Sequence, residues 1–330
     1  MRRIFLFLVW SFSAWALEVN LLEVDLSGKS GELLPFSFIV RNELSEPERV
    51  TIYLGDWDRD VTGENRFYPP GTVERSASFW VTVAPASFVL SGGEVREISG
   101  VVRVPPEVQP GTYWSIVFVQ GEPRLVPYQG VMVTVTRRIG IKIYVTIEPA
   151  EAKGILRAVE PKGLNPLWVL VKFANVGIRN LREVKGKLRV LDVQGNELVS
   201  LPIGPFPCLP GNERWVPVET NLRLSPGTYL VLAELDYGGE AVLAMPVRLV
   251  IRPLALRPLE EGLGMPGDLD GDGFFEDLDG DGAFTENDLA VFGRNLNSPL
   301  VKANFRAFDF NNDGVVDEND LAALEKLFRD

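Results

Sequence analysis

The chain has 330 residues, 46% hydrophobic and 24% charged, which is enough to form two or three globular domains. It contains no histidine, which excludes serine–histidine and cysteine–histidine nucleophiles and histidine-ligated metal sites. The net charge is −12, and it comes from residues 260–330, where 18 acidic residues accompany 5 basic ones. Such a local acidic excess predicts a cation site, and it argues against nucleic acid as a partner.

The first sixteen residues have the pattern of a secretory signal peptide. Two arginines precede the apolar run 4–10, and the small-x-small triplet 14–16 fits the cleavage rule. The alternative, an uncleaved membrane anchor, is disfavoured because a spanning helix needs ~20 apolar residues. We therefore expect a mature chain that begins at Leu17, has no transmembrane segment, and is secreted into the extracellular space or the periplasm.

Residues 17–252 alternate between short β-rich runs and turn clusters, with almost no helical periodicity. In the clearest run, every second residue of 131–135 and of 139–147 is apolar. This predicts one long strand, or two strands joined by a kink near 137–138. The pattern is typical of antiparallel sandwiches. The single cysteine, Cys208, excludes an intrachain disulfide and is expected to be a buried apolar residue.

An internal repeat divides this region into two copies. An L-x-G-x-E turn at 90–94 precedes P-G-T-Y at 110–113, and the same motifs recur at 209–213 and 226–229. Asn42 and Asn175 end apolar runs upstream of each copy. We expect each tyrosine to tie a strand end to nearby backbone. The repeat predicts two sandwiches, residues 17–148 and 149–252, whereas the alternative is a pair of unrelated Pro-Gly turns.

Two smaller signals lie inside the sandwiches. Residues 56–60, D-W-D-R-D, lack the glycine of a calcium loop, so we expect an exposed loop there. Five tryptophans are expected to lie in the cores and not to stack on sugars: Trp57, Trp80, Trp114, Trp168 and Trp215.

The two copies resemble bacterial immunoglobulin-like modules, and the first is similar to periplasmic pilus chaperones. The signals are the apolar strand that ends at Asn42, the run F-W-V-T-V-A-P at 79–85, and the L-x-G-x-E turn that follows. The resemblance implies two immunoglobulin-like domains. It also implies a long alternating strand, here 131–147, that pairs with a subunit by strand addition.

The composition changes after the second sandwich. Residues 253–267 are rich in Pro, Leu, Gly and Glu, and we expect a linker there. The last region, 268–330, opens with Asp268, Asp270 and Asp272 before a glycine, which begins a calcium-type loop whose position 12 falls on Asp279. This loop overlaps the next one, as in thrombospondin type 3 repeats. A third calcium ion at this loop is therefore an alternative to two ions alone.

Two complete twelve-residue loops follow, with the EF-hand spacing of oxygen ligands that Ca²⁺ requires. Position 6 is a glycine in both loops, and position 7 offers a backbone carbonyl. Positions 1, 3, 5, 7, 9 and 12 are Asp277, Asp279, Asp281, Ala283, Thr285 and Asp288 in the first loop, and Asp309, Asn311, Asp313, Val315, Asp317 and Asp320 in the second. Two full matches predict two calcium ions. The alternative, a solvated acidic tail, does not explain the glycines.

Each loop continues into a predicted helix. Thr285 and Asp317 are suitable N-caps, with an acidic residue three positions later. Apolar residues follow at helical spacing: Leu289, Phe292 and Leu296 in the first helix, and Leu321, Leu324 and Phe328 in the second. The two apolar faces can pack together, but they form a small core. Calcium is therefore expected to be required for folding.

The loop–helix repeats resemble the dockerin module, in which two calcium-binding repeats pair and bind a cohesin domain of another protein. The resemblance covers about 277–328 and includes Asp, not Glu, at position 12. It implies that positions 10 and 11 of the loops, Glu286-Asn287 and Glu318-Asn319, contact a protein partner, either a cohesin-like domain or a cell-surface component.

The sequence thus predicts a mainly β protein with two tandem immunoglobulin-like sandwiches and a small α-helical, dockerin-like calcium-binding module at 268–330. We expect an exported, non-catalytic adhesion or scaffold protein that docks on a protein partner. The alternative is a periplasmic chaperone that acts by strand complementation. An enzyme with a carboxylate pair is disfavoured, because no pair of acids in the sandwiches stands out.

Overall fold

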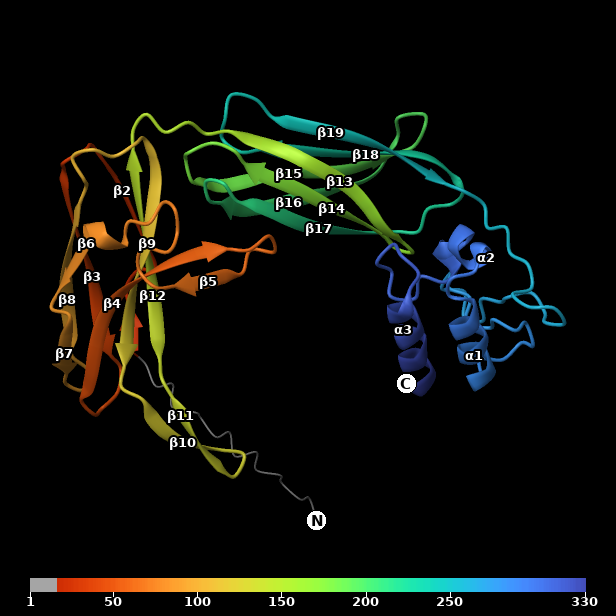
Figure 1. Ribbon diagram of the computed structural model, residues 1–330, viewed down its shortest axis with the longest axis horizontal. Helices are drawn as coiled ribbons and strands as arrows, with labels where there is room; N and C mark the ends of the chain where they lie inside the picture. Colours follow the sequence, from red (N-terminus) through yellow and green to blue (C-terminus); the bar gives the residue numbers. More distant parts are fainter. Residues whose placement is uncertain (1–16) are drawn as a thin grey trace, which may run out of the picture. The chain divides into compact units, whose positions relative to one another are not determined.

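The computed structural model describes residues 17–330, so the predicted signal peptide lies outside the described residues. These residues form two compact units. One consists of 17–59 and 64–151, and the other of 152–330 together with 60–63. Figure 1 shows that strands dominate both units and that the helices lie near the C-terminus.

The first unit is a β-sandwich of two sheets, ordered β1-β3-β8-β6 and β2-β12-β9-β4-β5, with β7 also paired to β4. Alternate residues of β3 and β8, such as Phe38, Val40 and Ile98, are buried between the sheets. The strands are β1 (Leu17–Val19), β2 (Glu23–Gly28), β3 (Leu33–Asn42), β4 (Glu48–Arg59), β5 (Asn65–Tyr68), β6 (Val81–Ala84), β7 (Ser87–Leu90), β8 (Val95–Arg103), β9 (Gly111–Gly121) and β12 (Arg138–Ile147), with a 3₁₀ turn at Ser78–Trp80.

The alternating segment 131–147 forms two strands, which confirms the predicted kink. β12 lies inside its sheet, antiparallel to β9 and parallel to β2, and its apolar residues are buried. β11 (Val131–Val135) instead forms a separate hairpin with β10 (Arg124–Tyr128). Leu125 and Met132 on this hairpin are 67% and 61% exposed. Only the hairpin part of the segment therefore has an unpaired edge among the described residues.

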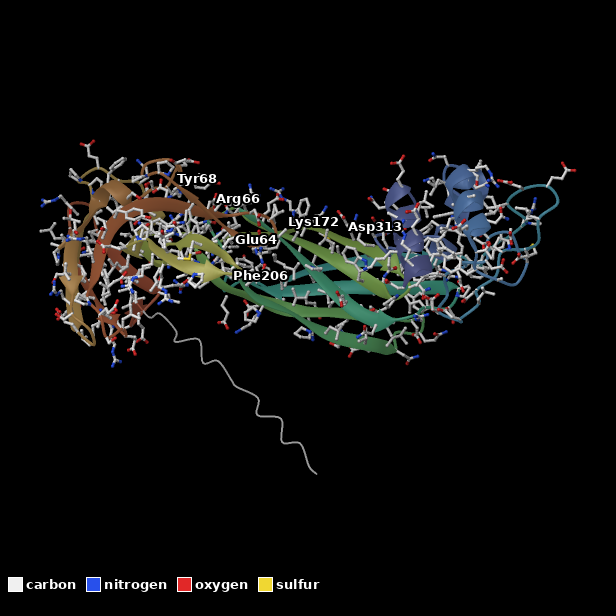
Figure 2. All side chains as sticks on the ribbon, turned by 90° about the horizontal axis from the view of Figure 1, so that it is seen from below. Glu64, Arg66, Tyr68, Lys172, Phe206 and Asp313 are labelled. Carbon is white, nitrogen blue, oxygen red and sulfur yellow. The ribbon has the colours of Figure 1, made fainter. Side chains whose placement is uncertain are left out.

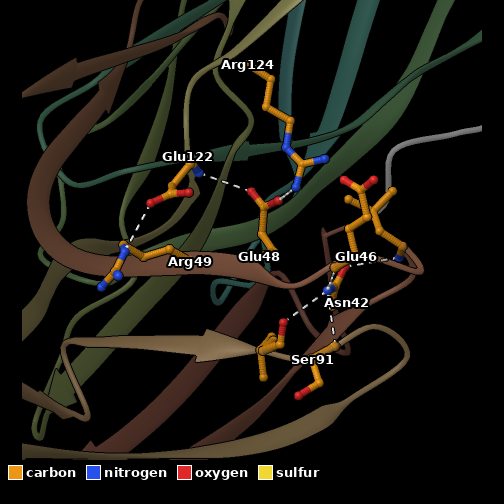
Figure 3. A network of polar contacts seen from close by, with 9 residues as sticks. Asn42, Glu46, Glu48, Arg49, Ser91, Glu122 and Arg124 are labelled. Atoms are coloured by element: carbon orange, nitrogen blue, oxygen red, sulfur yellow. Dashed lines mark hydrogen bonds and ion pairs between the residues drawn. The ribbon is translucent and has the colours of Figure 1, made fainter.

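Polar contacts hold the base of this hairpin to β4. The buried carboxylate of Glu48 accepts from Arg124 and from the backbone N–H of Glu122 at 3.0 Å (Figure 3). Arg49 Nε donates to the Glu122 carboxylate, also at 3.0 Å. A β-carbon at Gly121 would collide with a carboxylate oxygen of Glu48, so a larger residue there would displace this side chain. The hairpin therefore leaves the sandwich from a fixed base.

The second unit contains another sandwich, with sheets ordered β13-β14-β17 and β16-β15-β18-β19. Phe173, Leu188 and Val231 are fully buried between its sheets, and Cys208 is buried as expected. The strands are β13 (Gly154–Leu164), β14 (Leu167–Asn175), β15 (Leu181–Leu191), β16 (Glu197–Cys208), β17 (Glu213–Leu222), β18 (Gly227–Asp236) and β19 (Leu243–Ile251). The fold class predicted from the sequence, mainly β with a small helical region, is confirmed.

The sequence repeat is also a repeat of hydrogen bonds. The side-chain amides of Asn42 and Asn175 each donate to the carbonyl four residues ahead, at 2.8 Å in both. Their side-chain oxygens each accept from the N–H two residues ahead, at 3.0 Å in both. The hydroxyls of Tyr113 and Tyr229 each donate to the carbonyl four residues back, at 3.1 and 2.9 Å. The expected role of the two tyrosines is therefore confirmed.

The tryptophan prediction is only partly correct. Trp57 and Trp114 are buried in the first sandwich, as expected. Trp215 is 36% exposed, and the ammonium group of Lys172, labelled in Figure 2, lies 4.4 Å from its ring centroid. This cation–π contact gives the ring a partner at the surface, which the sequence pattern did not indicate.

The prediction of an exposed loop at 56–60 is wrong, because residues 56–59 are the end of β4 and pair with β5. Asp56 is fully buried. Its carboxylate is satisfied by four hydrogen bonds of 2.5–3.0 Å, donated by the N–H groups of Thr72 and Val73 and the hydroxyls of Ser76 and Ser78. A buried carboxylate is stable only with such partners, and they come from a distant segment.

We expect the substitution Asp56→Ala to destabilise the first sandwich by about 3 kcal/mol, because it leaves buried donors without an acceptor. The substitution Ser76→Ala removes only one of the four bonds and should cost about 1 kcal/mol. Urea unfolding measures the loss of stability in both variants, and hydrogen exchange of segment 69–78 shows whether the loss is located at the donors of Asp56. Equal unfolding midpoints for wild type and Asp56→Ala would contradict the structural role of this carboxylate.

Candidate metal centre

The acidic C-terminal region folds as a small helical module. Its helices are α1 (Glu286–Asn295), α2 (Pro299–Ala303) and α3 (Glu318–Arg329), with a 3₁₀ turn at Phe305–Ala307. Phe292, Phe308 and Leu324 are fully buried in its core. The predicted apolar faces of α1 and α3 are correct except at Phe328, which is 37% exposed. No helix among residues 17–330 is long and apolar enough to span a membrane.

The segment predicted to be a linker packs on this module. Leu254, Leu256, Leu259 and Leu263 lie against its core. Glu260 also pairs with Arg294 of α1 at 2.9 Å. The leucines of the segment therefore enlarge a core that α1 and α3 alone would leave small.

The first loop brings three of its predicted ligands together. The carboxylates of Asp277, Asp279 and Asp281 place oxygens within 4.8 Å of one another. Gly282 at position 6 has φ 88°, a backbone conformation that glycine adopts without strain. Thr285 caps α1, since its hydroxyl accepts from the N–H of Asn287 at 3.2 Å. Ala283, at position 7, precedes this cap by two residues.

Asp288 closes the first loop from the first turn of α1. It is fully buried. Its carboxylate accepts four hydrogen bonds of 2.7–3.1 Å, from the N–H groups of Leu278, Asp279 and Thr285 and from the hydroxyl of Thr285. The residue at position 12 thus joins the start of the loop to the start of the helix.

The second loop repeats this arrangement. The Asp309 carboxylate accepts from the N–H groups of Asp313 and Gly314, both at 2.9 Å. Asn311 donates to the Asp313 carboxylate at 3.0 Å, and Figure 2 labels Asp313 in this loop. The fully buried Asp320 accepts from the N–H of Asn311 at 3.2 Å.

The end of the second loop also matches the first. Asp317 caps α3 by accepting from the N–H of Asn319 at 2.8 Å, and it donates its own N–H to Asp320 at 2.7 Å. The Val315 side chain is 56% exposed and has no polar atom, so only the backbone carbonyl of this residue could be a ligand. Hydrogen bonds to Asp320 thus join the start of the second loop to the start of α3, whereas the acids that lie within 4.8 Å of one another belong to the upstream and first loops.

Two carboxylates of the second loop, Asp309 and Asp320, lie in surroundings that disfavour their charge. Burial raises the pKa of Asp309 to about 7, and the neighbouring charges of Asp320 and Asp313 act in the same direction. Burial also raises the pKa of Asp320. A divalent cation between these groups would offset both the lost hydration and the mutual repulsion.

The upstream loop differs from its prediction at position 12. Asp268, Asp270 and Asp272 do converge, but their fourth neighbour within 4.8 Å is Glu276, not Asp279. A β-bridge between Gly267 and Asp277 ends this loop early, so Asp279 joins the first loop instead. Glu276 occupies position 9 of the upstream loop, and the spacing of the acids in this loop could have identified it, although it was not among the ligands predicted from the sequence.

Burial raises the pKa of Glu276 and of Asp272, and the charges of Asp268 and Asp270 add to both shifts. The acidic side chains gathered in the upstream and first loops offer oxygen ligands only. Such a set suits a hard cation such as Ca²⁺ and does not suit zinc, which prefers nitrogen and sulfur ligands. The residues present therefore fit calcium.

Comparison with known protein families shows which domain this module resembles. Residues 275–329 match the dockerin type I domain, and this range contains both complete loop–helix repeats. The resemblance drawn from the sequence is thereby confirmed. Dockerin domains bind calcium and dock proteins, and the acidic clusters described above can hold a metal ion. No curated protein sequence matches the chain.

Solved structures of fimbrial chaperones are similar to this chain. One chain of a chaperone–tip adhesin complex of CFA/I fimbriae biogenesis is 12% identical over 70% of this chain and 98% of that chain, with a TM-score of 0.42. The class 5 fimbriae chaperone CfaA is 11% identical over 72% and 100%, with a TM-score of 0.39. The E. coli chaperone DraB is 18% identical over 72% and 97%, with a TM-score of 0.37. Likeness of this size carries no information on function.

Proposed function

We propose that this chain is an exported, non-catalytic protein that docks on a protein partner through its calcium-loaded helical module. The two sandwiches would serve as the adhesive or scaffolding part. The match of residues 275–329 to the dockerin type I domain is the observation that carries this proposal. The excess of acidic over basic residues, which is confined to residues 260–330, supports it.

We propose that two calcium ions are held by the complete loops. Asp277, Asp279 and Asp281 would bind one ion, with the Ala283 carbonyl, Thr285 and Asp288. The second ion would be held by Asp309, Asn311, Asp313, the Val315 carbonyl, Asp317 and Asp320. A third ion at Asp268, Asp270 and Asp272 would take Glu276 as its fourth carboxylate. The ions would neutralise these carboxylates and fix the shape of each loop.

Positions 10 and 11 of the loops are the proposed contacts for the partner. Glu286, Asn287, Glu318 and Asn319 are all exposed. The two pairs are not equivalent, because Asn287 donates to the Asp279 carboxylate at 2.5 Å and so belongs partly to the first loop. The glutamates are therefore the better probes of a binding surface.

The test is binding of the chain from Leu17 to a panel of cohesin domains and isolated cell-surface fractions, with calcium or with a chelator. We expect binding only with calcium. The double substitution Glu286→Lys and Glu318→Lys should weaken it at least tenfold, because reversed charge at the centre of an interface is costly. Glu97→Lys, an exposed acid in β8, is the matched control. Binding that is equal in chelator would refute the docking role.

A second candidate function rests on the β10–β11 hairpin. Its exposed apolar residues and unpaired edge fit strand addition to a fimbrial subunit, which is the chaperone-like alternative. Such a subunit would co-purify with the chain in the presence of chelator. The substitution Met132→Asp should abolish that co-purification and leave calcium-dependent docking unchanged. The two functions thus differ in their calcium requirement.

A further inference from the structure

Position 4 of the second loop is unusual among the three loops. Gly271 and Gly280 hold this position in the upstream and first loops, with φ of 79° and 73°. Asn312 holds it in the second loop, with φ 55°. An L residue is strained in this left-handed region, where glycine is not, and asparagine tolerates it better than most. The asparagine therefore requires an explanation outside the loop.

That explanation lies in the turn that joins β13 to β14 in the second sandwich. The Asn312 side chain accepts from the backbone N–H of Asn165 at 3.1 Å and donates to the carbonyl of Pro166 at 2.8 Å. The Asn312 carbonyl accepts from the indole N–H of Trp168 at 2.6 Å. Its own N–H donates to the carbonyl of Asp309 at 3.0 Å. Every polar group of Asn312 is thus used, and three of the four partners belong to the sandwich.

Glycines permit this close approach on both sides. A β-carbon at Gly163 of the sandwich would collide with Asn312, and one at Gly314 of the loop would lie 2.8 Å from the carbonyl oxygen of Lys162. Gly282, which is position 6 of the first loop, has no atom within 4 Å of such a β-carbon. The second loop is therefore seated on the sandwich, whereas the first loop is open at the same position.

The upstream loop touches the same turn. The side-chain amide of Asn165 donates to the carbonyl of Asp272 at 2.9 Å, and Arg223 donates to the same carbonyl. Asn165 therefore connects two of the three acidic loops, through its backbone to one and through its side chain to the other. Because these are contacts to specific backbone groups, they depend on the conformation of each loop.

We propose that residues 163–168 of the second sandwich are a docking surface for the calcium-loaded second loop, so that calcium binding and docking strengthen each other. Asn312 lies between Asn311 and Asp313, the ligands at positions 3 and 5. An ion that draws these two side chains together holds Asn312 in the conformation that the sandwich binds. Because coupling between two binding events is reciprocal, the sandwich raises the calcium affinity of the loop. The inference rests on the proposed calcium binding by this loop.

The first test is hydrogen exchange of wild-type chain from Leu17, with calcium or with chelator. The backbone N–H of Asn165 donates to the Asn312 side chain. Exchange of this backbone hydrogen should therefore slow at least tenfold with calcium. The second test is calorimetric titration of Asn312→Gly with calcium. This variant keeps the left-handed backbone and copies the other two loops, so it should fold. Because the variant loses two hydrogen bonds to the sandwich, calcium affinity should fall about tenfold at the second loop and stay unchanged at the first loop.

The control is Leu327→Ala, an exposed side chain on α3 outside the loops, which should bind calcium as wild type does. Calcium-independent exchange of Asn165, or unchanged affinity in Asn312→Gly, overturns the coupling. Absence of any binding heat from the second loop overturns its calcium site and the coupling together. Binding heat without protection of Asn165 overturns only the coupling, so the two failures are distinguishable.

Discussion

Removal of calcium is expected to unfold the helical module while both sandwiches remain folded. The module has nine buried apolar residues in its core, compared with 19 and 16 in the two sandwiches. Its loops concentrate carboxylates that repel one another without a cation. A core of this size supplies little net stability, and binding free energy of a metal is then folding free energy.

Hydrogen exchange with peptide resolution measures this effect in the intact chain. Peptides from α1 and α3 should exchange at least a hundredfold faster in chelator than in calcium, and peptides from β3 and β14 should be unchanged. Return of calcium should restore protection, since no covalent change is involved. Helices that stay equally protected in chelator would show that the apolar core alone folds the module.

The substitution Asp288→Ala is expected to abolish calcium binding by the first loop and to destabilise the module by about 3 kcal/mol. It removes the ligand at position 12 and leaves the four donors that this buried carboxylate satisfies without a partner. Calcium affinity of that site should fall more than a hundredfold. The second loop has its own position-12 acid, Asp320, and should retain its ion if the module stays folded.

Calorimetry gives the number and affinity of the sites, and thermal unfolding of the calcium-loaded chain gives the stability change. Glu286→Ala is the matched control, because Glu286 is an acid two positions earlier on the same helix and is exposed. It should leave calcium binding unchanged. Unchanged calcium affinity of the first loop in Asp288→Ala would refute the assignment of position 12.

The sequence by itself determined the parts of this protein that depend on interactions between residues close together in the chain. Positions 1, 3, 5 and 12 lie within twelve residues, so the spacing alone predicted that Asp277 and Asp288 belong to one loop. Helix caps such as Thr285 depend on neighbours two or three residues away. Strand alternation and the Tyr113 and Tyr229 motifs are also short-range, and they predicted the two sandwiches.

Only the tertiary structure decided features whose partners are distant in the sequence. Asp56 is buried because donors sixteen or more residues away satisfy it, so its local pattern suggested an exposed loop. Glu276, and not Asp279, lies with the three acids of the upstream loop, next to a β-bridge between Gly267 and Asp277. Asn312 looks like an ordinary turn residue until Asn165, 147 positions away, is placed against it. Spacing fixes which atoms can meet within a loop, whereas folding fixes which loops meet.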